Sequence, residues 1–119
     1  MDLKFKQKNR ILIVMVTGEI DHHNASTLRR KTENALSEWN GKHIIYDFEN
    51  VTFMDSSGIG VLIGRYKQLQ ALGGKIALVC THDNIRKIIS LSGLNKLIPA
   101  YDTIAEALSY VERRDKDAV

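Results

Sequence analysis

A predicted strand passes into a predicted helix at residues 53–62, which read Phe53-Met54-Asp55-Ser56-Ser57-Gly58-Ile59-Gly60-Val61-Leu62. Apolar side chains then recur at the three- and four-residue spacing of a buried helix face, namely Ile59, Leu62, Ile63, Tyr66 and Leu69. The helix is expected to begin after Asp55 and to end at Gly73-Gly74. A strand followed directly by an amphipathic helix is the repeating unit of a parallel sheet.

The rest of the chain repeats this unit. Runs of β-prone apolar residues predict strands at 3–7, 11–16, 43–48, 75–80 and 97–101. Amphipathic patterns predict three more helices. The first follows Asn24 and ends near Trp39, the second runs from about Asp83 to Gly93, and Thr103 caps the last. Residues 49–54 are expected to form a loop.

This order predicts an α/β fold with a mostly parallel central sheet, an N-terminal β-hairpin at its edge and about four helices. The turn of the hairpin is expected at residues 8–10. A chain of 119 residues suits one hydrophobic core, so residues 1–112 are expected to form a single domain. Residues 113–119 are a polar C-terminal tail.

The residue composition of the chain argues against several classes of function. The formal charge is +3, but the basic residues are scattered, so the continuous basic face of a nucleic-acid-binding protein is not predicted. Cys80 is the single cysteine and follows apolar residues, which predicts a buried and inert thiol. No apolar run approaches the roughly 20 residues of a membrane span, and residues 1–4 do not resemble a signal peptide. We expect a cytoplasmic protein that binds no membrane.

The two serines after Asp55 can be interpreted in three ways. They lie at a predicted helix N-terminus, where free backbone N–H groups favour an anion. They can be helix caps, a catalytic nucleophile or phosphate acceptors. A serine-hydrolase elbow needs glycine two residues before the nucleophile, where this chain has Met54 or Asp55. His22 and His23 should emerge at the same sheet edge as the serines, yet so short a chain leaves little material for a substrate pocket. Capping and phosphorylation both remain open.

Nucleotide and metal sites are weakly indicated. The segment Gly58-Ile59-Gly60 begins like a dinucleotide-binding loop, but Ile63 occupies the position of its third glycine. Gly58 instead gives backbone room at the helix entry, and Gly60 and Gly64 would let this helix or its partner approach closely. Adjacent histidines point in different directions on a helix or strand, so His22-His23 does not predict a metal centre. No cofactor is expected.

Four segments together resemble the STAS domain family, and within it the sporulation branch of the anti-sigma factor antagonists. They are Gly18-Glu19-Ile20-Asp21-His22-His23, residues 53–61, Gly64-Arg65-Tyr66-Lys67-Gln68 and Ser92-Gly93-Leu94. The Asp-Ser-Ser-Gly segment marks STAS antagonists broadly, whereas the first and third segments narrow the match to the sporulation branch. The resemblance extends from about residue 3 to residue 112.

The resemblance implies a partner-switching regulator without enzyme activity. Its unphosphorylated form would bind an anti-sigma factor that is also a serine kinase, thereby freeing a sporulation sigma factor. The kinase would phosphorylate Ser56 with Mg·ATP, and a PP2C-type phosphatase would reverse this. The implied partner-binding residues are those of the serine loop and of the neighbouring loop: Asp21, His22, His23, Asp55, Ser56, Ser57, Gly58 and Ile59.

An alternative within the same family is a STAS interaction module of a stress-response or sensory complex. The free protein is expected to be a monomer in either case. The residues alone leave Ser56 and Ser57 equally placed as acceptors, because both lie at the helix entrance. Only the resemblance selects Ser56.

Overall fold

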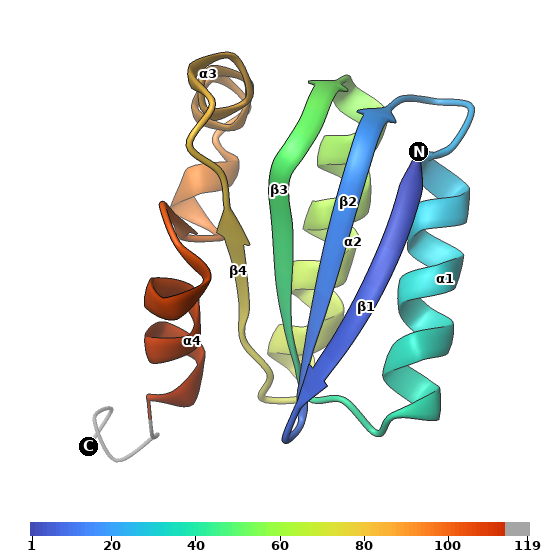
Figure 1. The fold of residues 1–119 in the computed structure, drawn as a ribbon, viewed down its shortest axis with the longest axis vertical. Coiled ribbons are helices and arrows are strands. Elements are labelled where there is room, and N and C mark those ends of the chain that lie inside the picture. Colours follow the sequence, from blue (N-terminus) through green and yellow to red (C-terminus); the bar gives the residue numbers. More distant parts are fainter. Residues whose placement is uncertain (114–119) are drawn as a thin grey trace.

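The computed structural model describes residues 1–113. The chain forms five strands and four helices in the predicted order β-β-α-β-α-β-α-β-α, with one short 3₁₀ turn added before the last strand. Figure 1 shows their arrangement. The elements are β1 (Asp2–Lys8), β2 (Ile11–Ile20), α1 (Ala25–Glu38), β3 (His43–Met54), α2 (Ser56–Ala71), β4 (Ile76–Val79), α3 (Asp83–Leu91), η1 (Leu94–Lys96), β5 (Ala100–Tyr101) and α4 (Ile104–Glu112).

The five strands form one sheet in the order β1-β2-β3-β4-β5. β1 pairs antiparallel with β2 through a tight turn in which Asn9 has a φ of 55°, and every later pair is parallel. The prediction of a mostly parallel sheet with a hairpin at its edge is confirmed. In such a sheet, the loops that follow β2, β3 and β4 all emerge at one end.

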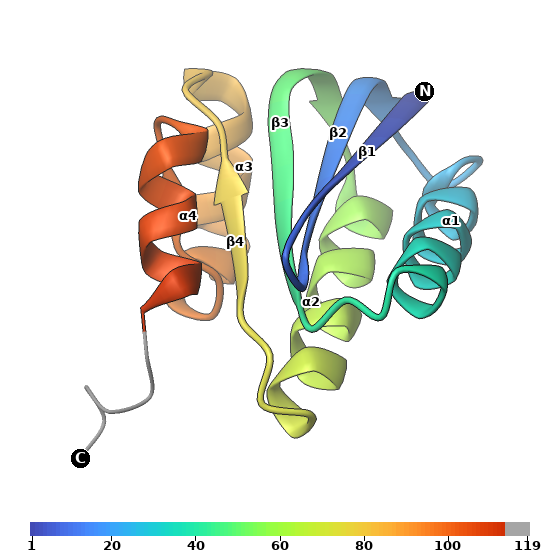
Figure 2. The same cartoon turned by 60° about the horizontal axis from the view of Figure 1, so that its bottom comes forward.

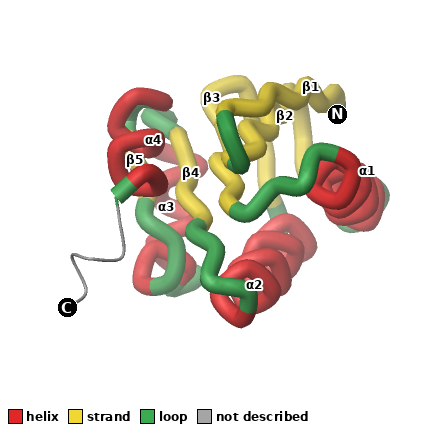
Figure 3. The backbone as a smooth tube through the Cα atoms, turned by 90° about the horizontal axis from the view of Figure 1, so that it is seen from below, coloured by secondary structure: helices red, strands yellow, loops and turns green. Residues whose placement is uncertain are grey.

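The helices cover both faces of the sheet because side chains of a strand alternate between faces. Along β2, Leu12 and Val14 join the larger core cluster, which α1, α2 and α3 cover. Ile11 and Ile13 point to the opposite face and join a smaller cluster under α4. Figure 3 shows α2 and α4 on opposite sides of the sheet, and Figure 2 shows α1 at the β1 side and α4 at the β4 side.

Two strands are longer than the sequence predicts by four residues or more. β2 continues past Gly18, which has a φ of 102°, and β3 continues through residues 49–54, where a loop was predicted. The two extensions pair with each other, with a register shift near Gly18. The prediction of a loop was wrong because Glu49 and Asn50 interrupt the apolar run, although the strand continues and buried residues recur beyond them. Val51 and Met54 are buried, and Thr52 and Phe53 are exposed.

Towards the C-terminus, the predicted helix cap agrees with the structure and the predicted last strand is shortened. Thr103 caps α4 by accepting a hydrogen bond from the Glu106 N–H at 3.1 Å, as predicted. The final strand is reduced to β5, which has two residues instead of the five expected. Residues 114–119 of the expected polar tail lie outside the described residues.

The turn between α2 and β4 is packed against the start of β3. The Gly74 N–H donates to the Leu69 carbonyl at 2.7 Å, which closes the last turn of the helix. A Cβ added to Gly74 would lie 2.1 Å from the backbone carbonyl oxygen of Lys42. Gly74 is therefore required by the close approach of two backbones.

Candidate functional site

The register between β2 and β3 brings two loops together at one end of the sheet. Ile20 pairs with Met54 at the ends of these parallel strands, so the residues that follow each strand emerge side by side. The Asp55 N–H donates to the Ile20 carbonyl at 3.1 Å and ties the second loop to the first. Asp21-His22-His23 and Asp55-Ser56-Ser57 therefore form one continuous area, which we call the Ser56 surface.

Asp55 caps α2. Its Oδ1 accepts a hydrogen bond from the Ser57 N–H at 2.8 Å, and its carbonyl accepts one from the Gly58 N–H at 3.1 Å. The N-cap residue of α2 is therefore Asp55, and neither Ser56 nor Ser57 caps the helix. Ser56 is exposed as the first residue of the helix, whereas Ser57 is half-buried, so the structure separates two hydroxyls that the sequence alone could not distinguish.

Asp55 is also the ionisable residue of this surface whose side-chain pKa is shifted. Partial desolvation raises the pKa of its carboxyl, but hydrogen bonds from the backbone and side chain of Ser57 and from the N–H groups of His22 and Gly58 outweigh it. The net effect lowers the pKa below the ordinary value of 3.8. The carboxylate is therefore charged throughout the neutral range.

This shift predicts how acid affects the cap. Because the folded-state pKa lies below the unfolded value, the capping contribution is complete above the unfolded value and is lost as the pH falls through the folded one. In a carbon-detected NMR titration, the Asp55 carboxyl is expected to titrate below 3.8. An Asp55→Asn variant should lose less stability than the wild type between neutral pH and pH 3. Equal losses in the two proteins would contradict the assignment.

Gly58 and Ile59 support the surface from below. A Cβ on Gly58 would lie 2.6 Å from Cγ of Met54 and 3.0 Å from Cγ2 of Ile20, so this glycine lets α2 begin directly over the ends of β2 and β3. Ile59 packs into the main core with only 8% exposure. Both were predicted as partner-binding residues. In the free protein they are buried and shape the surface that the exposed residues present, and their part in partner binding stays a prediction.

The first loop is ordered by reciprocal hydrogen bonds. Oδ1 of Asp21 accepts from the N–H groups of His23 and Asn24, and the Asp21 N–H donates to Oδ1 of Asn24. His22 and His23 remain exposed, with their ring centroids 3.9 Å apart. Nδ1 of His22 lies 3.9 Å from Oδ2 of Asp55. The histidines therefore flank the cap of α2 and can contact any protein that reaches Ser56.

A groove with a volume of about 570 Å³ runs between α1 and α2 from this surface. His22 and Ser57 line its upper end, and Arg29, Gly64 and Arg65 line it further down. The sequence did not predict this groove, because it depends on how two helices pack side by side. The one available signal was the pair of glycines, Gly60 and Gly64, which line it in the structure.

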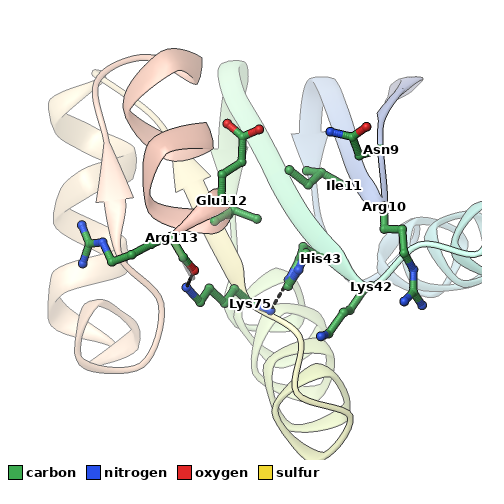
Figure 4. A pocket seen from close by; sticks show the side chains of 9 residues that line it. Asn9, Arg10, Ile11, Lys42, His43, Lys75, Glu112 and Arg113 are labelled. Atoms are coloured by element: carbon green, nitrogen blue, oxygen red, sulfur yellow. Dashed lines mark hydrogen bonds between the residues drawn. The ribbon is translucent and has the colours of Figure 1, made fainter. Parts of the chain in front are cut away.

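A second hollow lies at the opposite end of the sheet and is lined by basic side chains, including Arg10, Lys42, Lys75 and Arg113 (Figure 4). Two of them already bind backbone carbonyls near helix C-termini. Nε of Arg10 donates to the Asn40 carbonyl at 3.1 Å, and Nζ of Lys75 donates to the Arg113 carbonyl at 2.7 Å. Cations at helix C-termini stabilise the fold, which accounts for Arg10 and Lys75.

Three further predictions concern the thiol of Cys80, a metal site and a membrane-spanning helix. Cys80 is fully buried, as predicted, and burial raises the pKa of its thiol. Within residues 1–113, no three side chains of His, Cys, Asp or Glu gather as a metal site. In the same part of the chain, no helix combines the length and apolar character of a membrane span.

The model of the STAS domain family matches residues 2–107 of this chain. The chain belongs to the STAS domain family. Its sequence is 34% identical to the anti-sigma F factor antagonist of Paenibacillus polymyxa over 112 residues, which cover 94% of this chain and 96% of that relative. The match includes the Ser56 surface and both helices of the groove.

Solved structures agree with this assignment. The STAS domain described here resembles the anti-sigma factor antagonist SpoIIAA in its unphosphorylated form, with a TM-score of 0.78, 32% identity and coverage of 92% of this chain and 96% of that one. It also resembles the Bacillus cell fate determinant SpoIIAA in the phosphorylated form, with a TM-score of 0.71, 30% identity and coverage of 93% and 100%. The resemblance inferred from the sequence is confirmed.

Proposed function

We propose that this STAS domain is an anti-sigma factor antagonist that is switched by phosphorylation of Ser56. Its unphosphorylated form binds an anti-sigma factor and thereby frees a sporulation sigma factor. The protein catalyses no reaction itself and acts in the cytoplasm as a monomer when free. It contacts proteins rather than nucleic acid or membrane. The similarity to the anti-sigma F factor antagonist of Paenibacillus polymyxa supports this partner class.

One observation carries the choice of Ser56. Its hydroxyl is exposed at the first position of α2, next to the capping carboxylate of Asp55, whereas Ser57 is half-buried and turned to the groove. A kinase needs an accessible hydroxyl, so Ser56 is the better acceptor. The N-terminus of α2 also tolerates the added phosphate, because free N–H groups and the helix dipole favour negative charge there.

The proposed cycle has two covalent steps. The anti-sigma factor acts as a serine kinase and transfers the γ-phosphoryl group of Mg·ATP to the Ser56 oxygen, with release of ADP and the hydroxyl proton. A PP2C-type phosphatase then hydrolyses the phosphoester and restores the serine. Phosphate adds nearly two negative charges to the middle of the contact area, and forcing them against a partner without a cation is unfavourable. The partner therefore dissociates.

A phosphorylation assay tests the proposal. We expect the anti-sigma factor of the same organism, supplied with Mg·ATP, to add one phosphate to the wild type and to Ser57→Ala, and none to Ser56→Ala. Tandem mass spectrometry locates the phosphate. Ser56→Ala should still bind the anti-sigma factor, because it keeps the surface and cannot be released by phosphorylation. Phosphate on Ser57 instead would contradict the choice of acceptor.

The same assay addresses the alternative function. If the wild type binds no sporulation anti-sigma factor but binds the corresponding protein of a stress-response or sensory complex, the STAS module serves that pathway. If it binds a partner and receives no phosphate, it is a constitutive binding module. Either result would overturn the proposed cycle.

A further inference from the structure

Arg65 is a buried cation without an anionic partner in the described chain. Only 4% of the residue is exposed, on the side of α2 that faces α1. One guanidinium nitrogen donates to the Arg29 carbonyl at 3.0 Å, and another binds the side-chain amide of Gln68. The guanidinium also lies beside the buried hydroxyl of Tyr46, while its Nε makes no hydrogen bond. No carboxylate among residues 1–113 forms an ion pair with it. A buried charge held only by neutral groups would be stabilised further by a counter-charge.

The residues that line the groove above Arg65 include two cations and one carboxylate. The N-terminus of α1 lies at its upper end with no acidic residue in its first turn, whereas the N-terminus of α2 is already capped by the carboxylate of Asp55. Arg29 lines it as a second cation. Glu33 is the single carboxylate among its lining residues, and it forms no ion pair within the described part of the chain.

The floor of the groove on α2 is open backbone. Gly60 and Gly64 are exposed, and a Cβ added at either position would have no atom within 4 Å. The sequence suggested that these glycines allow a partner to approach closely, and no segment of residues 1–113 reaches them. A polypeptide that entered from outside could therefore approach the α2 backbone closely, with a side chain reaching Arg65.

We infer that the groove between α1 and α2 binds an acidic segment of the anti-sigma factor, whose carboxylate pairs with Arg65 and Arg29. This inference rests on the proposed function. Charge complementarity supports it, and so does continuity, because His22 and Ser57 belong both to the groove and to the Ser56 surface. A partner bound at Ser56 lies at the entrance of the groove. The glycine-lined floor extends along α2 beyond the reach of a single small anion.

Binding measurements on matched variants test the inference. By isothermal titration calorimetry with the anti-sigma factor, Arg29→Glu should bind about tenfold more weakly than the wild type or worse, because it places like charge against the carboxylate. Arg30→Glu is the control, since Arg30 is equally exposed on α1 but does not line the groove. It should change the affinity by less than about twofold.

A second pair of variants tests the shape of the groove without changing charge inside it. Gly64→Leu should fill the floor and weaken binding by about tenfold or more, because a side chain there excludes the incoming segment. Lys67→Leu places the same side chain on an exposed part of α2 outside the groove, and should bind nearly as the wild type does. Thermal unfolding checks that each variant is folded.

Cross-linking identifies the partner's group. An Arg29→Lys variant places an amine in the groove, and a zero-length carbodiimide reagent joins amines to carboxylates in contact. We expect mass spectrometry of the complex to find this lysine joined to an Asp or Glu of the anti-sigma factor. An Arg30→Lys variant should give no such product.

The outcomes separate this inference from the proposed function. If the wild type binds and is phosphorylated while Arg29→Glu and Gly64→Leu bind equally well, the groove is not used and the inference fails alone. If millimolar inorganic phosphate shifts the NMR signals of Arg29 and Arg65 while both variants keep wild-type affinity, the groove holds a small anion and the inference also fails. If the wild type binds no anti-sigma factor, the proposed function fails first.

Discussion

A Ser56→Asp variant is expected to bind the anti-sigma factor about a hundredfold more weakly than the wild type, a loss of about 2.7 kcal/mol. The exposed side chain of Ser56 lies in the middle of the surface formed by the two loops. An aspartate there brings a charge that must be desolvated against the partner, beside the existing carboxylate of Asp55. Calorimetry of the purified proteins measures the change.

The control places the same substitution on a distant helix. Ser37 is exposed near the C-terminal end of α1, so Ser37→Asp adds an equal charge far from the Ser56 surface and should leave the affinity almost unchanged. Circular dichroism should show the same fold for both variants, because the N-terminus of α2 tolerates an acidic side chain. Wild-type affinity of Ser56→Asp would show that release does not depend on charge exclusion.

A Gly74→Ala variant is expected to lose about 3 kcal/mol of folding free energy, the upper part of the range for overpacked sites. The new methyl group would lie 2.1 Å from the Lys42 carbonyl oxygen, and backbone rather than a flexible side chain stands in its way. Either the turn before β4 or the start of β3 must move, which disturbs the central parallel pair. Denaturant unfolding measures the loss.

Gly64→Ala is the matched control for this stability prediction. Gly64 lies within α2, and an added Cβ there meets no atom within 4 Å. This variant should therefore be as stable as the wild type or up to about 1 kcal/mol more stable, because alanine favours the helix. A Gly74→Ala protein that unfolded at the wild-type denaturant concentration would contradict the close approach of the two backbones.

The hydrophobic pattern predicted the fold well, because each strand and helix buries a face whose spacing can be read locally. It located α2 from Ile59 and Leu62, and it found the cap of α4 at Thr103. It failed where pairing with a neighbouring strand, and not the local residue composition, decides the structure. Residues 49–54 form strand because β2 continues beside them, and no local signal reports that a neighbouring strand extends past a glycine.

Some features of the candidate site could likewise be predicted from the sequence, and others could not. Parallel strands place their following loops at one sheet edge, so the proximity of His22 to the serines was predictable from element order alone. The burial of Arg65 was not. Its position on α2 suggests an ordinary amphipathic helix until α1 packs against it, and the groove exists only once both helices are in place.

The tight contact of Gly58 with Met54 and Ile20 has a consequence for how information is stored in this protein. Because the residues under Ser56 have no room to rearrange, we expect the backbone to be the same before and after modification. The two states would then differ in charge alone, and the record of the last enzyme to act would persist for as long as the phosphoester does. Each partner could read that record on contact, without waiting for a change of shape.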